Sequence, residues 1–246
     1  MVKTNRQESG GVNVSMEKDL STLEKKLGVK FQKKELLRQS LVHRSFLNEH
    51  PSFSVGNNER LEFLGDAVLE VVVTEFLFKN YSEPEGELTN WRASLVRSEQ
   101  LALVATDLGI EKYLYLSKGE SNDKTPKAKQ TILANACEAI IGAIYLDQGL
   151  ETARKFIEGN FLIRLENILE NQLYRDPKSL VQEMSQEKLG ITPVYKVIKE
   201  SGPDHKKHFV IGVWFEKELI AEGEGSSKQA AQLSAAQNAL KAKDWE

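Results

Sequence analysis

The spacing of the apolar residues changes near residue 176, and this change limits the architectures open to the chain. Before it, apolar residues recur at the three- and four-residue intervals of helices. After it, a short helical segment is followed by three segments with the pattern of strands and then by an alanine-rich helix. The sequence therefore predicts an all-α domain followed by a small α+β domain with the order α-β-β-β-α.

Composition indicates the limits of these domains. Residues 1–18 are polar, with few large apolar side chains, and we expect a flexible N-terminal tail. The helical domain is predicted over 19–170 and the α+β domain over 176–244, with 171–175 as the linker. At 246 residues the chain is long enough for two such domains, each with its own core.

Apolar periodicity and helix breakers divide the helical domain into segments. Loops are predicted at 51–58 and 119–126, where polar residues accumulate with glycine and proline. The predicted helical segments are 20–27, 34–47, 59–76, 89–108, 131–146 and 150–169.

The bulk charge and the cysteine count exclude several classes of protein. A net charge of −3 and a pI near 6.0 argue against a uniformly basic surface, so nucleic-acid binding would depend on local clusters of Lys and Arg. The single cysteine, Cys137, excludes an internal disulfide and a cysteine-built zinc site. The chain has neither an apolar run of the roughly 20 residues that cross a bilayer nor a signal peptide, so we expect a cytoplasmic protein without a membrane partner.

Three acidic residues share one face of the predicted helix that begins at residue 59. Glu59, Glu62 and Asp66 lie at positions i, i+3 and i+7, and apolar residues fill the positions between them. Three acids in an apolar helix repel one another unless a cation or a salt bridge compensates, and Mg²⁺ favours carboxylate oxygens. The spacing alone leaves two interpretations open: a magnesium site, or a solvated acidic stripe neutralised by Arg60 or other basic groups.

A second pair of oxygen-bearing side chains lies in the apolar segment 132–143. Asn135 and Glu138 are spaced i, i+3 in this segment, and core packing alone does not explain them. Two such helices, on crossing, would gather four side chains around one cation: Glu62, Asp66, Asn135 and Glu138.

The stretch 58–69 resembles the signature of the ribonuclease III family almost letter for letter. The segments 41–45, 119–120 and 138–147 are similar to other segments of that family. The resemblance extends from about residue 20 to the end of the chain. It implies a bacterial-type ribonuclease III, in which an all-α endonuclease domain precedes a double-stranded-RNA-binding domain.

The resemblance implies metal-dependent hydrolysis of phosphodiester bonds in double-stranded RNA, which leaves 5′-phosphate and 3′-hydroxyl ends. Mg²⁺ is the implied cofactor, with Mn²⁺ as the alternative ion, and no organic cofactor is expected. The implied metal ligands are Glu62, Asp66, Asn135 and Glu138. The implied catalytic residues are Asp66 and Glu138, together with Glu59, which organises substrate and water, and Glu85, which lies near the scissile strand.

Asn135 departs from the family pattern, which has Asp at this position. Its amide oxygen can coordinate a metal or hold a metal-bound water, but the site has one negative charge fewer. We therefore expect a working enzyme that needs more Mg²⁺. The alternative is a catalytically impaired double-stranded-RNA-binding protein that keeps the fold. Against this alternative stand the retained acidic residues Glu59, Glu62, Asp66, Glu85 and Glu138.

The C-terminal segment resembles a double-stranded-RNA-binding domain in residues 176–183, 193–195, 202–207 and 223–228. Such a domain recognises the shape of A-form RNA through its minor groove, its 2′-hydroxyls and its phosphates. The residues implied in RNA binding are Gln182 and Glu183 on the first helix, His205, Lys206 and Lys207 in a loop, and Lys228 at the start of the last helix. Because Gln229 stands where a further basic residue is common, we expect weak, strongly salt-dependent binding by this domain alone.

The resemblance also implies a homodimer in which the acidic cluster of each subunit cuts one strand, so that the products carry short 3′ overhangs. Phe63 would pack across the dimer, with a place in the core as the alternative. The implied substrates are ribosomal RNA precursors and structured messenger RNAs. We expect His43 to be a hydrogen-bonded structural residue rather than a catalyst.

Overall fold

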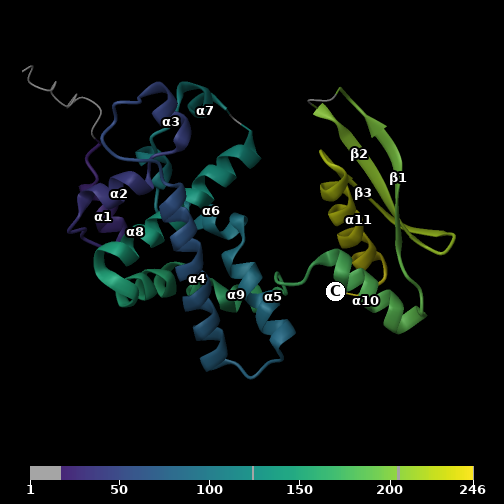
Figure 1. Ribbon diagram of the computed structural model, residues 1–246. Helices are drawn as coiled ribbons and strands as arrows, with labels where there is room; N and C mark the ends of the chain where they lie inside the picture. Colours follow the sequence, from purple (N-terminus) through teal and green to yellow (C-terminus); the bar gives the residue numbers. More distant parts are fainter. Residues whose placement is uncertain (1–17, 124, 204–205, 246) are drawn as a thin grey trace, which may run out of the picture. The chain divides into compact units, whose positions relative to one another are not determined.

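The computed structural model describes residues 18–123, 125–203 and 206–245, which form two compact units divided between Asn167 and Ile168. The first unit is built from helices, and the second contains a three-stranded sheet with two helices (Figure 1). The predicted fold class, an all-α domain followed by an α-β-β-β-α domain, is confirmed.

The first unit has a long helix, α4, packed against an even longer one, α8. Both are largely apolar, and their buried side chains include Leu69 and Val72 of α4 and Ile140 and Ile144 of α8. Helices α2 and α6 also pack on α8, which therefore lies at the centre of this unit. The elements in chain order are α1 (Ser21–Leu27), α2 (Lys34–Ser40), α3 (Arg44–Glu49), α4 (Glu59–Asn80), α5 (Glu85–Val96), α6 (Ser98–Asp107), η2 (Ile110–Tyr113), α7 (Lys118–Asn122), α8 (Pro126–Asn160), η3 (Leu162–Arg164) and α9 (Leu165–Glu170).

Three helices that we predicted as continuous are divided, so those predictions were wrong. The segment 34–47 is interrupted because Val42 leaves the helix to pair with Tyr115 in an isolated parallel bridge. The segment 89–108 is interrupted at Arg97, whose backbone is extended between α5 and α6. The segment 150–169 is interrupted at Phe161, where α8 ends and the short helices η3 and α9 follow. In the first case a tertiary contact outweighs a helical pattern, which a local reading of the sequence does not detect.

The segment around residue 126 also differs from the prediction. The predicted loop at 119–126 contains the short helix α7, and α8 begins at Pro126 rather than at 131. Proline suits the first turn of a helix because its missing N–H has no intrahelical acceptor there. Near its other end α8 has a break at Gly149, whose φ of 81° and ψ of −179° favour glycine, and this break corresponds to the predicted interruption between 146 and 150.

The second unit is an antiparallel sheet in the order β1-β2-β3 with both helices packed in its core. Asp176 caps its first helix by accepting a hydrogen bond from the backbone N–H of Ser179 at 2.9 Å, and Pro177 occupies the first helical position. The elements are α10 (Pro177–Leu189), β1 (Val194–Ser201), β2 (His208–Phe215), β3 (Glu218–Gly225) and α11 (Lys228–Ala242).

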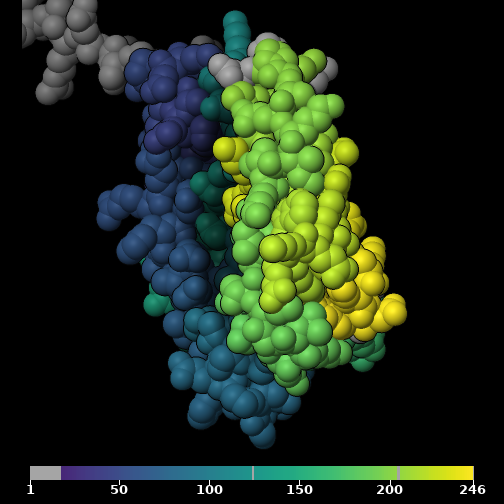
Figure 2. All heavy atoms as spheres, turned by 90° about the vertical axis from the view of Figure 1, so that its right-hand side faces the viewer, coloured from purple at the N-terminus to yellow at the C-terminus, as the bar shows by residue number. Residues whose placement is uncertain are grey.

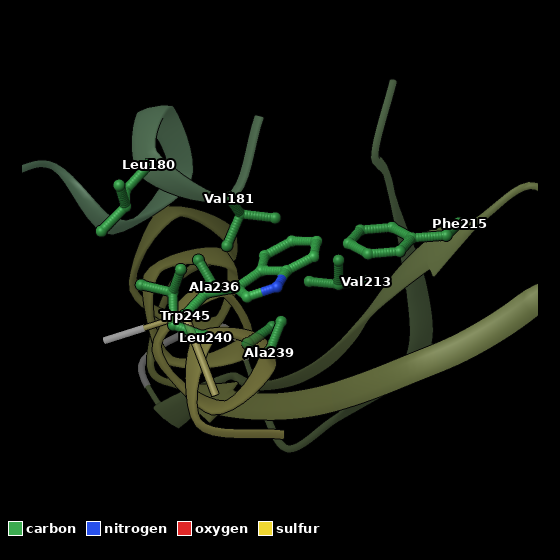
Figure 3. Close-up of a cluster of buried hydrophobic side chains, with 9 residues drawn as sticks. Leu180, Val181, Val213, Phe215, Ala236, Ala239, Leu240 and Trp245 are labelled. Atoms are coloured by element: carbon green, nitrogen blue, oxygen red, sulfur yellow. The ribbon is translucent and has the colours of Figure 1, made fainter. Parts of the chain in front are cut away.

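The core of the second unit joins both helices to the middle strand (Figure 3). Trp245 stacks on Phe215 of β2 with 5.7 Å between the ring centroids, and Val181 of α10 and Leu240 of α11 belong to the same cluster. Gly223 of β3 faces α11 so closely that a Cβ atom there would overlap the backbone nitrogen of Ala235. This close packing sets how near the middle of α11 lies to β3.

The opposite face of this sheet is open. Strand β1 is exposed along most of its length, as is visible in the space-filling view, where the strands face the viewer and α11 is yellow (Figure 2). Apolar side chains on the strands remain partly exposed, among them Val197, Ile198 and Leu219. Among the described residues, no helix combines the length and apolar character needed to cross a membrane.

Candidate active site and nucleic-acid interface

Two glycines allow α4 and α8 to approach each other at backbone distance. A Cβ atom on Gly65 of α4 would overlap the carbonyl oxygen of Glu138 and lie 2.8 Å from the backbone nitrogen of Gly142. A Cβ atom on Gly142 of α8 would in turn overlap the carbonyl oxygen of Leu61. Side chains next to this crossing are therefore brought together from the two helices.

The predicted ligand residues flank this crossing. Glu62 and Asp66 project from α4, and Asn135 and Glu138 project from α8. The side chain of Asn135 is hydrogen-bonded to Glu62. The charges of Asp66 and Glu62 both act on Glu138 and raise its pKa. The structure thus brings together the four residues that the sequence assigned to one cluster.

Burial and mutual repulsion make this cluster electrostatically unfavourable. Burial raises the pKa of Glu138 to about 8, and the charges of Asp66 and Glu62 add to that rise. The pKa of Glu62 is also raised, first by burial and then by the charge of Glu59, while the hydrogen bond from Asn135 acts in the opposite direction. A bound cation would offset this repulsion.

The donor set fits a hard cation, because it consists of carboxylate and amide oxygens only. In the part of the chain that the structure describes, no group of three or more His, Cys, Asp or Glu side chains is arranged so that it could hold a metal ion. The three acids Glu62, Asp66 and Glu138 repel one another, and the fourth oxygen donor, Asn135, is an amide. The chemistry of the cluster therefore matches a metal site, although its side chains are not in ligating positions.

Glu59 lies at the edge of the cluster and is exposed. Arg44 approaches it with 3.4 Å between Nη1 and Oε1, and the amide of Asn57 donates a hydrogen bond of 3.0 Å to Oε2. The adjacent Asn58 is buried, and its backbone N–H donates to the carbonyl of Val42. The start of α4 is thereby tied to the segment that precedes α3.

Glu85 is not brought to this cluster within one chain. It is the first residue of α5, which follows the far end of α4 (Figure 1). From Asp66 to Asn80 the helical rise alone covers about 21 Å along the axis. The predicted role of Glu85 therefore requires either a separate point on the substrate or the site of a second subunit.

The side chain of Phe63 lies outside the core. It is 82% exposed on α4, and Phe78 on the same helix is 78% exposed. Val71 is also exposed, and with Thr74, Phe78 and neighbouring residues it lines a hollow of about 440 Å³. The alternative of a core position for Phe63 is thus wrong, and α4 presents an uncovered apolar surface.

In the second unit the predicted RNA-binding residues are exposed or half-buried. Gln182 and Glu183 are exposed on α10, and Lys228 is exposed at the first position of α11. Lys206 and Lys207 precede β2, whereas His205, also predicted to contact RNA, lies outside the described residues.

An acidic residue accompanies the lysines predicted to bind RNA. Glu200 of β1 forms an ion pair with Lys207, with 2.9 Å between Oε1 and Nζ. The hydrogen bond from Lys207 and the charges of Lys207 and Lys228 hold the pKa of Glu200 below its usual range. The negative charge of Glu200 therefore reduces the positive potential by which these lysines would attract a phosphate. This pairing was not predicted from the sequence.

Comparison with known proteins identifies both units. A family model described as ribonuclease-III-like matches residues 33–165, and one described as a double-stranded RNA binding motif matches residues 177–243. The chain is 46% identical over 225 residues to the ribonuclease 3 of Nitratiruptor sp., covering 91% of this chain and 96% of that protein. The chain belongs to the ribonuclease III family. It is also 44% identical over 223 residues to the ribonuclease 3 of Dehalococcoides mccartyi, covering 90% and 94% of the two chains.

Solved structures of the ribonuclease III family resemble the first unit. A nuclease domain of ribonuclease III from Campylobacter jejuni, described for structural flexibility in a region involved in dimer formation, is 42% identical with a TM-score of 0.52. The match covers 58% of this chain and 99% of that domain. A second structure of the Campylobacter jejuni domain gives a TM-score of 0.51 at 41% identity, covering 59% of this chain and 97% of that chain.

Sequence reasoning about this ribonuclease III family member missed the residues that position the cluster. Gly65 and Gly142 set the approach of the two helices, and Asn58 anchors the start of α4. A glycine inside each of two apolar helices is the signal that could have indicated a close crossing. The hydrogen bond from the backbone N–H of Asn58 to the carbonyl of Val42 has no corresponding signal in the sequence.

Proposed function

We propose that this protein is an endoribonuclease that hydrolyses phosphodiester bonds of double-stranded RNA. Its products would be 5′-phosphate and 3′-hydroxyl ends with short 3′ overhangs. The observation that carries the proposal is the crossing of α4 and α8, which gathers Glu62, Asp66, Asn135 and Glu138 in a chain whose two units match the ribonuclease III and double-stranded RNA binding families. We infer that the substrates are ribosomal RNA precursors and structured messenger RNAs. We also infer that the protein acts in the cytoplasm.

Glu62, Asp66, Asn135 and Glu138 would hold Mg²⁺, or Mn²⁺ in its place. The ion supplies a water of lowered pKa and screens the charge of the scissile phosphate. Burial and the acidic neighbours of Glu138 raise its pKa to about 8, so without a cation this carboxyl group holds a proton at neutral pH. The exposed Glu59, steadied by Arg44, would orient water and RNA beside the cluster.

The second unit would deliver the duplex to this site. Gln182 and Glu183 on α10 are free of core packing and can bond within a minor groove, while Lys206, Lys207 and Lys228 can neutralise phosphates. His205 would add a contact in the next minor groove. For the domain limits we propose 19–170 and 176–244, joined by 171–175.

We infer a homodimer formed through α4. The exposed Phe63, Val71 and Phe78 make an apolar surface on this helix, which a second copy would remove from water. A pair of sites related by two-fold symmetry would cut the two strands at offset positions. In such a dimer Glu85 could reach the site of the partner.

The alternative, a catalytically impaired RNA-binding protein, has no support from the comparisons. Both relatives named above are ribonucleases 3, and the match to this chain covers more than nine-tenths of the length of each. Asn135, the residue that favoured the alternative, takes part in the cluster through its bond with Glu62.

The deciding experiment incubates the protein with a long RNA duplex in Mg²⁺ and in EDTA, and determines the product ends. We expect Mg²⁺-dependent products with 5′ phosphates and staggered ends. Glu138→Gln should remove cleavage, whereas Glu166→Gln, an exposed acid on α9 outside the cluster, should retain it. Binding of the duplex without cleavage in Mg²⁺ or Mn²⁺ would contradict the proposal.

A further inference from the structure

A chain of hydrogen bonds joins two short helices of the first unit that lie far apart in sequence. Ser45 Oγ lies 2.8 Å from Nδ1 of His43 and accepts a hydrogen bond of 3.2 Å from the backbone N–H of Ser117. Ser117 Oγ in turn accepts a hydrogen bond of 3.2 Å from the backbone N–H of Glu120. These hydrogen bonds therefore connect His43, which precedes α3, with Glu120 in α7; both helices are labelled in Figure 1.

These bonds determine which nitrogen of His43 carries the proton in the neutral ring. The backbone N–H of Ser45 donates to Nδ1 at 3.3 Å, so Nδ1 is an acceptor. The proton of a neutral imidazole is then on Nε2, which becomes a donor. Burial lowers the pKa of His43, which favours the neutral ring. No described residue is hydrogen-bonded to Nε2.

The surroundings of His43 are acidic. Glu120 and Glu59 both act on its charge, and Arg44 opposes them. Glu59 belongs to the edge of the candidate active site, so the ring lies in the neighbourhood where the duplex would be held. A phosphate would be repelled by the two carboxylates, whereas a hydroxyl group can accept from Nε2–H and donate to a carboxylate.

We propose that His43 and Glu120 form a two-point site for a ribose 2′-hydroxyl of the RNA substrate. His43 donates from Nε2 to the hydroxyl oxygen, and Glu120 accepts the hydroxyl proton in a hydrogen bond. Only ribose offers this group, so the pair contributes to the discrimination of RNA from DNA beside the active site. The proposal rests on the proposed function, because it requires double-stranded RNA as the substrate.

The simpler interpretation is that His43 is only a helix cap, since its side chain accepts from the first turn of α3. Two substitutions separate these roles. His43→Asn keeps an oxygen acceptor near the position of Nδ1, and asparagine is a favourable N-cap, but the donor at Nε2 is lost. His43→Gln keeps a donor near the position of Nε2 and loses the cap.

The experiment measures kcat/KM for RNA duplexes that carry a single 2′-deoxynucleotide, moved through about one helical turn on each side of the cleavage site. With the unsubstituted protein, we expect one position at which the missing hydroxyl lowers kcat/KM by about three- to tenfold, the effect of one or two hydrogen bonds. His43→Asn should lower kcat/KM on the all-RNA duplex by the same factor and show no further loss at that position. Glu120→Ala should lower kcat/KM by the same factor and show no further loss at that position. The variant should keep its fold here, because only the backbone N–H of Glu120 donates to Ser117 Oγ. His43→Gln should recover part of the rate.

Either of two results would overturn the proposal. One is that no single deoxy position affects the unsubstituted protein. Another is that His43→Asn or Glu120→Ala, with an unchanged melting temperature, keeps both the full rate and the full sensitivity at every position. Failure of the proposed function is distinguishable, because the unsubstituted protein would then leave the all-RNA duplex uncut before any variant is compared, and the present proposal would fall with it.

Discussion

The side chain of Asn135 is hydrogen-bonded to the carboxylate of Glu62, which joins α8 to α4 inside the acidic cluster. A carboxylate accepts hydrogen bonds, so the amide N–H₂ of Asn135 is the donor. This bond lowers the pKa of Glu62 against the larger effects of burial and of Glu59. Asn135, where the family has Asp, thus relieves part of the repulsion among the acids of the cluster. An aspartate at this position would increase that repulsion.

Asn135→Asp should lower the Mg²⁺ concentration at half-maximal cleavage by a factor on the order of ten, because the site gains a negative charge. Without metal the same variant should be less stable at pH 8, since it loses the donor to Glu62. The measurements are a Mg²⁺ titration of cleavage and a thermal melt in EDTA. Equal Mg²⁺ midpoints for the two proteins would show that charge at residue 135 does not govern metal affinity.

The raised pKa of Glu138 predicts that the metal-free protein loses stability as the pH rises. The folded state holds this proton up to a pKa of about 8, against 4.5 for an ordinary glutamate, so the stabilisation is full below pH 4.5 and is lost as the pH rises towards 8. Glu138→Gln has no such titration and should melt about 2 °C or more above the unsubstituted protein at pH 8 in EDTA. At pH 4.5 the two should melt together. A gap that is the same at both pH values would contradict this origin.

Gly65→Ala should destabilise the first unit by about 3 kcal/mol or more, because the added methyl group meets backbone atoms that cannot rotate away. Cleavage should fall with the fold, as the two halves of the cluster move apart. Gly159→Ala is the matched control, since it is also in a helix but has nothing within 4 Å of the new Cβ atom. It should stabilise by about 0.5–1 kcal/mol. Urea unfolding of both variants checks the contrast, and a neutral Gly65→Ala would refute the backbone contact.

Phe63→Glu should convert a dimer to a monomer, because a charge would be buried in the inferred contact. Sedimentation velocity measures the change, and cleavage of both strands at offset positions should be lost with the dimer. Leu189→Glu replaces another exposed apolar residue, in α10, and should leave the sedimentation coefficient unchanged. A variant at residue 63 that remains a dimer would place the interface elsewhere.

Glu200→Gln should strengthen binding of double-stranded RNA by about two- to fivefold, the range for release of a lysine from an exposed ion pair. The gain should shrink at high salt, where the competing charge is screened. Glu216→Gln makes the same change of charge at the other end of β2 and should have a smaller effect. Adding Lys207→Gln should remove the gain, and a gain that persists without Lys207 would show a long-range effect instead.

The sequence predicted the fold class and the members of the acidic cluster because both depend on local spacing. Glu62 and Asp66 share a helix face by periodicity, and the family signature supplied their role. The sequence did not predict that the helix expected over 34–47 is divided at Val42. The bridge from Val42 to Tyr115 joins residues far apart in the chain, so no local pattern indicates it. The ion pair of Glu200 with Lys207 was missed for the same reason, since it depends on how a loop returns to a strand.

The crossing at Gly65 and Gly142 has a consequence for how such a protein can change over generations. The separation of α4 and α8 at this point is set by main-chain atoms, which every sequence shares. Substitutions that enlarge or shrink apolar side chains elsewhere in the core therefore leave the spacing of the acids nearly constant. Residues such as Asn135 can then vary one at a time, so the metal requirement can be adjusted without rebuilding the helices that carry it.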